Sequence, residues 1–174
     1  MQLKVLVTGA YNAGKTEFIR SISEIDPVST ERKITSSDGM GKEETTVAMD
    51  FGRITIDEDL VLYIFGTPGQ ERFDFMWELL SEGILGYVVI VDSKDVESLV
   101  HTKKMLEFFE PLDVPFVVAA NKQDIQGALD VSEIRKKLNL TDGVQVLPCV
   151  ASQRESVKEV LLTLLFEVLE LLEE

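Results

Sequence analysis

The sequence is poor in cysteine, histidine, aromatic residues and positive charge. Its one cysteine, Cys149, excludes an internal disulfide, and no apolar stretch approaches the roughly 20 residues that a membrane-spanning helix requires. Seventeen basic residues stand against 31 acidic ones, and the formal net charge of −14 repels nucleic acid and anionic lipid. We therefore expect a cytoplasmic protein with no nucleic-acid binding and no direct membrane binding. The short N-terminal apolar run and the final Glu173-Glu174 also predict neither a secretory leader nor a prenyl anchor.

The rest of the composition predicts one domain over residues 1–174, because 45% of the residues are hydrophobic and can form a substantial core. Short β-branched runs alternate with helix-like segments, which is typical of an α/β fold with helices on both faces of the sheet. We expect a mostly parallel sheet of six strands with one antiparallel edge strand. Apolar runs place strands at residues 3–7, 46–56, 60–65, 84–91 and 115–120, and helices at 15–23 and 97–110.

Two segments near the start of the chain bear on the edge of this sheet. Residues 46–56 and 60–65 flank a short acidic connection, so they should form an antiparallel hairpin. Residues 26–44 are polar, contain two glycines and a proline, and lack apolar periodicity. We interpret residues 26–44 as a long mobile loop.

The C-terminal segment predicts a helix with one broad apolar stripe that packs on the sheet. This stripe consists of Val157, Val160, Leu161, Leu164, Leu165, Val168, Leu171 and Leu172. A second stripe of Leu162, Phe166 and Leu169 has two interpretations, either further core or a surface for another chain. His101 lies in a charged segment and is expected on the solvated surface of its helix.

Residues 9–16 match the pattern G-x-x-x-x-G-K-[ST] between a predicted strand and a predicted helix. The glycines let backbone N–H groups close around a phosphate, and the helix N-terminus adds the positive end of its dipole. In this pattern Lys15 reaches the β and γ phosphates and Thr16 offers its hydroxyl to Mg²⁺. The segment therefore predicts a site for a nucleoside triphosphate and magnesium.

A second polar segment, Asn121-Lys122-Gln123-Asp124, follows a predicted strand and so lies at the carboxyl edge of the sheet. A carboxylate at Asp124 can accept hydrogen bonds from the N1–H and the exocyclic amine of guanine. Adenine carries an acceptor at N1 and would leave this carboxylate unpaired. The segment is a weak signal by itself, but together with the phosphate loop it favours guanine.

With these two motifs the sequence resembles the Ras-like small GTPases, from residue 3 to the final helix. Residues 46–51 (TVAMDF) resemble the end of switch I, and residues 69–73 (GQERF) resemble switch II. The resemblance implies a P-loop NTPase fold of the small G-protein kind that binds GTP or GDP with Mg²⁺. It implies that Thr16 and Thr46 hold the metal, and that Lys15 and Gln70 act in catalysis. The implied nucleotide-binding residues are Tyr11, Asn12, Ala13, Gly14, Lys15, Thr16, Glu17, Thr46, Gly69, Asn121, Lys122, Asp124, Ala151 and Ser152.

The sequence departs from the family pattern near the phosphates. Gly66-Thr67-Pro68-Gly69 stands where the pattern is D-x-x-G, so the aspartate that holds a magnesium water is absent. This departure resembles the prokaryotic branch, notably MglA-type and actinobacterial conservon-type GTP-binding proteins. Asp50 has two interpretations, an inward carboxylate that compensates or a solvated aspartate at a strand end. Tyr11 and Asn12 also replace small glycines that are common in Ras proteins, and this puts an aromatic ring near the place where Gln70 would approach. We therefore expect slow intrinsic hydrolysis.

These observations predict a two-state switch that binds Mg-GTP, hydrolyses it slowly to GDP and signals through switch I and switch II to a protein regulator or effector. Two alternatives stay open: a GTP/GDP-dependent binding module without hydrolysis, and an ATP-dependent kinase or ATPase, which leaves residues 121–124 unexplained. The resemblance implies a roadblock-type partner, and we expect a monomer or weak dimer. Arg32 and Arg72 could each act as an arginine finger, although a solvated loop arginine is the more ordinary interpretation.

Overall fold

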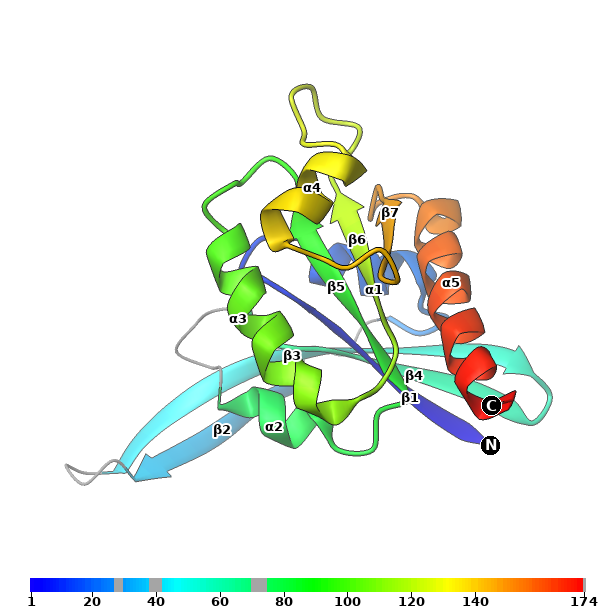
Figure 1. Cartoon of the computed structure of the whole chain (residues 1–174). Coiled ribbons are helices and arrows are strands. Elements are labelled where there is room, and N and C mark those ends of the chain that lie inside the picture. Colours follow the sequence, from blue (N-terminus) through cyan, green and yellow to red (C-terminus); the bar gives the residue numbers. More distant parts are fainter. Residues whose placement is uncertain (27–29, 38–41, 70–74, 174) are drawn as a thin grey trace.

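The structure, a computed structural model, describes residues 1–26, 30–37, 42–69 and 75–173, and over residues 30–37 and 42–48 it describes the backbone alone. Seven strands of these residues form one sheet in the order β2-β3-β4-β1-β5-β6-β7 (Figure 1). The strands are β1 (Gln2–Gly9), β2 (Thr30–Ser37), β3 (Lys42–Asp57), β4 (Leu60–Gly66), β5 (Gly86–Asp92), β6 (Phe116–Asn121) and β7 (Gln145–Pro148). The helices are α1 (Lys15–Ile22), α2 (Met76–Ser81), α3 (Leu99–Phe109), α4 (Val131–Leu138) and α5 (Arg154–Glu173), with a short 3₁₀ helix η2 (Glu110–Leu112).

Most of the sheet is parallel. β1 pairs in parallel with β4 and β5, β5 with β6, and β6 with β7. β3 runs antiparallel to β4, as the acidic connection between them predicts. The predicted α/β class, the mostly parallel sheet and the hairpin are therefore confirmed, with β1 and β3 to β7 supplying the six expected strands.

The prediction of a long loop over residues 26–44 is wrong. Strand β2 lies within it and pairs antiparallel with β3, from Thr30 opposite Met49 to Ser37 opposite Lys42. An edge strand takes its hydrogen bonds from the backbone of its neighbour, so a polar sequence without apolar alternation can form one. β2 thereby adds a seventh strand, and the β2–β3 ribbon extends beyond the helices in Figure 1.

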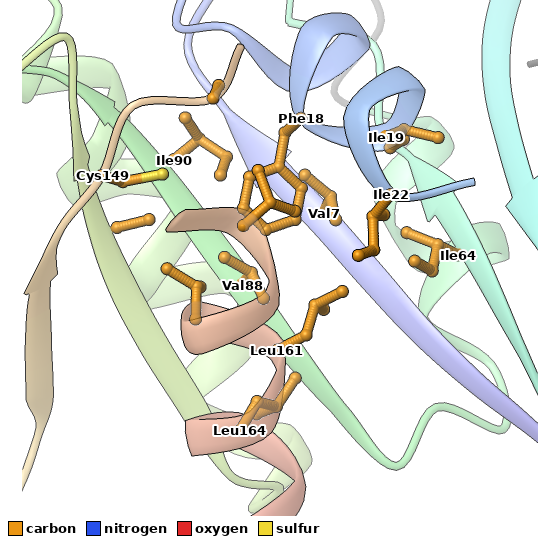
Figure 2. Close-up of a cluster of buried hydrophobic side chains, with 14 of the residues drawn as sticks. Val7, Phe18, Ile19, Ile22, Ile64, Val88, Ile90, Cys149, Leu161 and Leu164 are labelled. Atoms are coloured by element: carbon orange, nitrogen blue, oxygen red, sulfur yellow. The ribbon is translucent and has the colours of Figure 1, made fainter. Parts of the chain in front are cut away.

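Two hydrophobic clusters lie on opposite faces of the sheet, because alternate residues of each strand point to opposite sides. On β5, Val88 and Ile90 belong to one cluster, and Val89 and Val91 belong to the other. Figure 2 shows the first cluster, in which Phe18, Ile19 and Ile22 of α1 and Leu161 and Leu164 of α5 face Val7, Ile64, Val88 and Ile90. Residues of α2, α3 and α4 pack into the second cluster. Helices therefore cover both faces, as predicted.

Three features of the helices differ from the packing expected from the sequence. Leu171 and Leu172 do not pack on the sheet with the rest of their stripe, because they are exposed. The second stripe on α5 is not core, because Leu162, Phe166 and Leu169 are exposed. Its interpretation as a surface for another chain stays a prediction. His101 is buried and its ring lies 5.6 Å from the Trp77 ring, so its expected solvation is wrong.

None of the helices in the described part of the chain is both long and apolar enough to cross a membrane.

Candidate functional site

The segments singled out by sequence meet at one edge of the sheet. The phosphate loop follows β1, Asn121 ends β6, and Ala151 follows β7. Because these strands are parallel, their carboxyl ends lie at the same edge, where open α/β sheets bind ligands (Figure 1). The fold therefore gathers residues that are far apart in the sequence.

The phosphate loop requires both of its glycines. Gly9 and Gly14 have φ values of 157° and 110°. A Cβ atom at Gly9 would lie 2.4 Å from the Ile90 carbonyl oxygen, and one at Gly14 would lie 2.3 Å from the Asn121 Nδ2 atom. Helix α1 begins directly after Gly14, and no side chain in the described part of the chain caps its N-terminus. Its first N–H groups are thus available to an anion.

Lys15 is buried and turns back onto its own loop. Its Nζ atom donates hydrogen bonds to the carbonyl oxygens of Gly9 at 2.6 Å and Ala10 at 2.8 Å. Burial lowers the pKa of Lys15 to about 8, although the nearby Asp50 charge opposes this shift. A buried ammonium that is held mainly by carbonyl oxygens gains stabilisation from an anion, which agrees with a phosphate site.

Asn121 joins the phosphate loop to the loop after β7. Its Nδ2 atom donates to the Ala13 carbonyl oxygen at 2.8 Å, and its Oδ1 atom accepts from the Ala151 N–H at 2.9 Å. Ser21 on α1 donates to the Ala151 carbonyl oxygen. We call this set of contacts the Asn121 clasp, and it holds three separate segments in one arrangement.

Lys122 and Gln123 extend this network through partners that the sequence analysis missed. Lys122 Nζ bonds the Asn12 carbonyl oxygen at 3.0 Å and the buried Asp92 carboxylate at 2.5 Å. Gln123 Nε2 donates to Ser93 Oγ at 3.0 Å and to the Leu129 carbonyl oxygen at 2.8 Å. Polar residues directly after the apolar run of β5 could have indicated Asp92 and Ser93.

Around this network, two residues that were predicted to contact the base are open to solvent. Asp124 and Ser152 are both exposed at the same edge of the sheet. Their positions leave room for a ligand to approach from outside. The clasp itself is buried beneath them, because Asn121 and Ala151 are 4% exposed.

The two interpretations of Asp50 are separated by its contacts. Thr16 Oγ1 donates a hydrogen bond to Asp50 Oδ2 at 2.5 Å, and Asp50 is half-buried. The side chain thus turns toward the phosphate loop and remains partly exposed to solvent. On the other side of the loop, a Cβ at Gly69 would lie 2.5 Å from Lys15 Nζ and 2.8 Å from the Tyr11 nitrogen. Gly69 therefore adjoins the phosphate loop, as its proposed contact with phosphate requires.

Of the other residues predicted for the nucleotide site, the structure describes some only in part and others not at all. Gln70, Arg72 and Phe73 lie outside the described residues. Thr46 lies on β3, opposite Lys33 of β2, and Arg32 lies on β2. For these residues the structure describes the backbone and not the side chains. Glu17 is exposed and forms an ion pair with Arg20 at 3.2 Å, while Tyr11 is exposed beside Gly69.

The donors at the phosphate loop fit magnesium that is shared with a nucleotide. No group of three or more His, Cys, Asp or Glu residues suited to a metal occurs among the described residues. The available donors, the Thr16 hydroxyl and the Asp50 carboxylate, are oxygens, which Mg²⁺ prefers. Magnesium usually takes only one or two protein ligands and fills its shell with phosphate oxygens and water. The site can hold the ion in this shared way.

A separate hollow of about 680 Å³ lies between α3 and α4. Its lining includes Phe116, the first residue of β6, whereas Asn121 ends that strand. It therefore lies at the amino end of the strand and belongs to a different edge of the sheet. We do not assign it to the nucleotide site.

Comparison with known proteins places the chain in a family. Residues 26–171 match the family model described as "Conserved hypothetical ATP binding protein", a span that begins after the phosphate loop. An uncharacterized protein of Methanocaldococcus jannaschii is 32% identical over 137 residues, which cover 76% of this chain and 77% of that protein. ADP-ribosylation factor-like protein 3 of Saccharomyces cerevisiae is 29% identical over 168 residues, covering 91% and 81% of the two chains.

Among solved structures, the Arl6 small GTPase of Trypanosoma brucei with bound GppNp superimposes with a TM-score of 0.74. The two share 21% identity, and the match covers 98% of this chain and 99% of that one. At this identity the likeness shows the fold, and the fold is that of the Ras-like small GTPases with Arf-like relatives. Resemblance to the prokaryotic branch is not shown by these comparisons. From the family match and the archaeal relative, the chain belongs to the conserved hypothetical ATP binding protein family.

Proposed function

We propose that this protein is a guanine-nucleotide-dependent switch that binds Mg-GTP, hydrolyses it slowly to GDP and signals to a protein partner. The Asn121 clasp carries the proposal, because it fixes the phosphate loop and the loop of Ala151 around one point at the sheet edge. A nucleotide has its base and its phosphates at opposite ends, so a site for it must hold two such loops at a fixed separation. The names of the Arf-like relatives and the GppNp-bound neighbour support the same function.

ATP is the second candidate ligand, because the family description names it. Asp124 favours guanine, since its carboxylate can accept from the N1–H and the exocyclic amine of that base. Adenine offers an acceptor at N1 and would face the carboxylate without a hydrogen bond. The proposal therefore predicts that GTP displaces bound ATP, and that ATP does not displace bound GTP at similar concentration.

Asp124→Asn tests the base assignment. The substitution replaces one acceptor with a donor and should weaken GTP binding by roughly 2 to 4 kcal/mol, while improving the relative binding of xanthosine triphosphate. Asp142→Asn is the matched control, because Asp142 is also exposed but lies in the connection between α4 and β7. Equal GTP affinity in wild type and Asp124→Asn, measured by calorimetry, would contradict the guanine assignment.

The proposed roles of the phosphate-side residues follow from their chemistry. Lys15 would bind the β and γ phosphates, and Gly69 would donate its N–H to the γ phosphate. Thr16 and Thr46 would hold Mg²⁺, which neutralises charge that develops on the phosphate oxygens. Gln70 would orient the attacking water. Tyr11 beside Gly69, and the absence of a carboxylate at Gly66, support a slow intrinsic reaction.

Single-turnover cleavage of GTP separates the switch from a module that binds without hydrolysis. Gln70→Leu should lower the chemical rate while nucleotide affinity stays nearly unchanged, because water orientation matters only in the transition state. Tyr11→Gly should raise the rate if the ring restricts access to the site. If wild type binds GTP and never cleaves it, the non-hydrolysing module is the better account.

The finer placement of the protein is part of the same proposal. Gly66 in place of an aspartate supports the prokaryotic branch of MglA-type and conservon-type proteins. A regulator or effector, with the roadblock type as the first to test, would read switch I and switch II, and the protein would act in the cytoplasm as a monomer or weak dimer. The net charge of −14 supports partners other than nucleic acid and bare membrane.

A further inference from the structure

Asp50 lies beside the hydroxyl that the phosphate loop offers to a metal. It accepts the hydrogen bond of Thr16 Oγ1 at 2.5 Å. Its charge also acts on Lys15, the residue directly before Thr16. The carboxylate is therefore part of the phosphate end of the site, although it comes from β3 and not from the loop itself.

The pairing of β3 with β4 explains how Asp50 reaches this place. Asp50 lies directly opposite Gly66 in the antiparallel register. Residues directly opposite each other in such a pair project to the same face of the sheet. A carboxylate at position 50 thus serves the same face, and nearly the same point on it, as a carboxylate at position 66 would.

The absence of a side chain at Gly66 also makes room for Asp50. A Cβ atom there would lie 3.2 Å from the Asp50 Cβ and 2.9 Å from the Ile19 Cδ1 atom of α1. Gly52, two residues farther along β3 on the same face, is likewise pressed against Ile19, at 2.7 Å from a notional Cβ. Helix α1 therefore packs closely on this face, and Asp50 is the polar residue where the face meets the phosphate loop.

We infer that Asp50 is the acidic group of the magnesium site and takes the place of the carboxylate that is missing at position 66. The inference rests on the proposed function, because the ion is held together with nucleotide phosphates. Thr16 donates its hydrogen to Asp50, which leaves the lone pairs of its oxygen for a cation. Asp50 is thus a positioning residue that orients the hydroxyl and adds negative charge beside the ion.

This placement also changes which segment controls the metal. The acidic group belongs to β3, the strand that contains Thr46, and not to the segment after β4 that contains Gly69. Four residues of extended strand span about 13 Å, so Asp50, and not Thr46, is the group of β3 that lies beside Thr16 in this conformation. Contacts that hold β3 in place should consequently affect the magnesium requirement more than contacts of the segment after β4.

The test measures how much Mg²⁺ is needed to retain a nucleotide. The dissociation rate of a fluorescent GDP analogue is followed while Mg²⁺ is titrated into chelated protein. Asp50→Asn keeps the size of the side chain and removes its charge, and it should raise the Mg²⁺ concentration for half-maximal retention about 10-fold or more. Asp59→Asn removes the same charge from the exposed turn between β3 and β4 and should leave the titration unchanged.

Two readouts separate a metal role from a structural one. In chelator, Asp50→Asn should release the analogue at nearly the wild-type rate, and its metal-free melting temperature should match wild type. If Asp50→Asn needs no more Mg²⁺ than wild type, the inference is overturned while the proposed nucleotide binding stands. If wild type itself fails to bind GDP or GTP, the proposed function falls, and the inference falls with it.

The proposed equivalence of positions 50 and 66 can be tested by moving the carboxylate from one position to the other. Asp50→Gly should resemble Asp50→Asn in its Mg²⁺ requirement. The double variant Asp50→Gly/Gly66→Asp frees the space that the Asp50 Cβ occupies, and it should recover most of the wild-type Mg²⁺ dependence. A folded double variant that needs as much Mg²⁺ as Asp50→Gly would overturn the claim that the two positions are equivalent.

Discussion

The two ends of the proposed nucleotide site differ in how far the protein completes them by itself. At the base end, Asn121 donates a hydrogen bond to the Ala13 carbonyl oxygen and accepts one from the Ala151 N–H, so these groups are paired within the protein. At the phosphate end, Lys15 is a buried cation whose pKa is lowered to about 8 by burial. The base end is therefore arranged by internal hydrogen bonds, whereas the phosphate end carries a charge that an anion would stabilise.

Removal of the Asn121 clasp should destabilise the protein more than any other substitution considered for this site. Asn121→Ala leaves the Ala13 carbonyl and the Ala151 N–H without their partner, in a buried position. We expect the free energy of unfolding of the nucleotide-free protein to fall by about 2 to 4 kcal/mol, because each unsatisfied buried group carries a desolvation penalty. Urea denaturation measures this change.

Gln126→Ala is the control for this experiment. Gln126 is exposed, and its contact with Lys94 uses the backbone carbonyl, which the substitution keeps. Its stability should be close to that of wild type. A loss below about 0.5 kcal/mol in Asn121→Ala would mean that the base end is not arranged by the clasp.

The charge of Lys15 at the phosphate end can be tested through the pH dependence of GTP binding. Burial lowers the pKa of Lys15 to about 8, and phosphate next to the ammonium should raise it. Above that pH the free lysine is neutral and the bound lysine is charged, so binding must take up a proton. GTP affinity should then fall by up to about tenfold per pH unit, which corresponds to about 1.4 kcal/mol.

Calorimetry near pH 9 in buffers of different ionisation enthalpy would detect this proton uptake directly. Lys15→Arg is the control, because a guanidinium stays charged across this range and takes up no proton on binding. Both proteins contain the same contacts to guanine, so any titration of the guanine ring cancels when the proton uptake of the two proteins is compared. Equal proton uptake by wild type and Lys15→Arg would show that Lys15 is already fully charged before GTP arrives.

The smallest expected effect concerns the support of the clasp by α1. Ser21 donates a hydrogen bond to the Ala151 carbonyl oxygen, and Ser21→Ala should lower the free energy of unfolding by about 1 kcal/mol. Ser132→Ala, at an exposed position of α4, is the matched control. If Ser21→Ala destabilises the protein as much as Asn121→Ala, the serine and not the asparagine organises the base end.

Local motifs allowed much of the site to be predicted. The phosphate loop requires glycines, lysine and threonine at fixed short spacing, and the Asn121 segment follows a recognisable strand, so both are visible in a few consecutive residues. The strands and helices of the parallel region were predictable for a similar reason, since their apolar runs pack into the two clusters. Asp92 escaped notice because its partner, Lys122, is 30 residues away.

The α/β class, the hairpin and the residue types at the carboxyl edge follow from the sequence, because each depends on local spacing and alternation. Three features became visible only in the folded chain: polar residues 30–37 form a strand, His101 is buried against Trp77, and Asp50 faces Thr16. In these three cases the outcome depends on a neighbour that is distant in sequence or on its backbone. The clearest case is Asp50, whose direction is set by its register opposite Gly66 and by the space that a glycine leaves there.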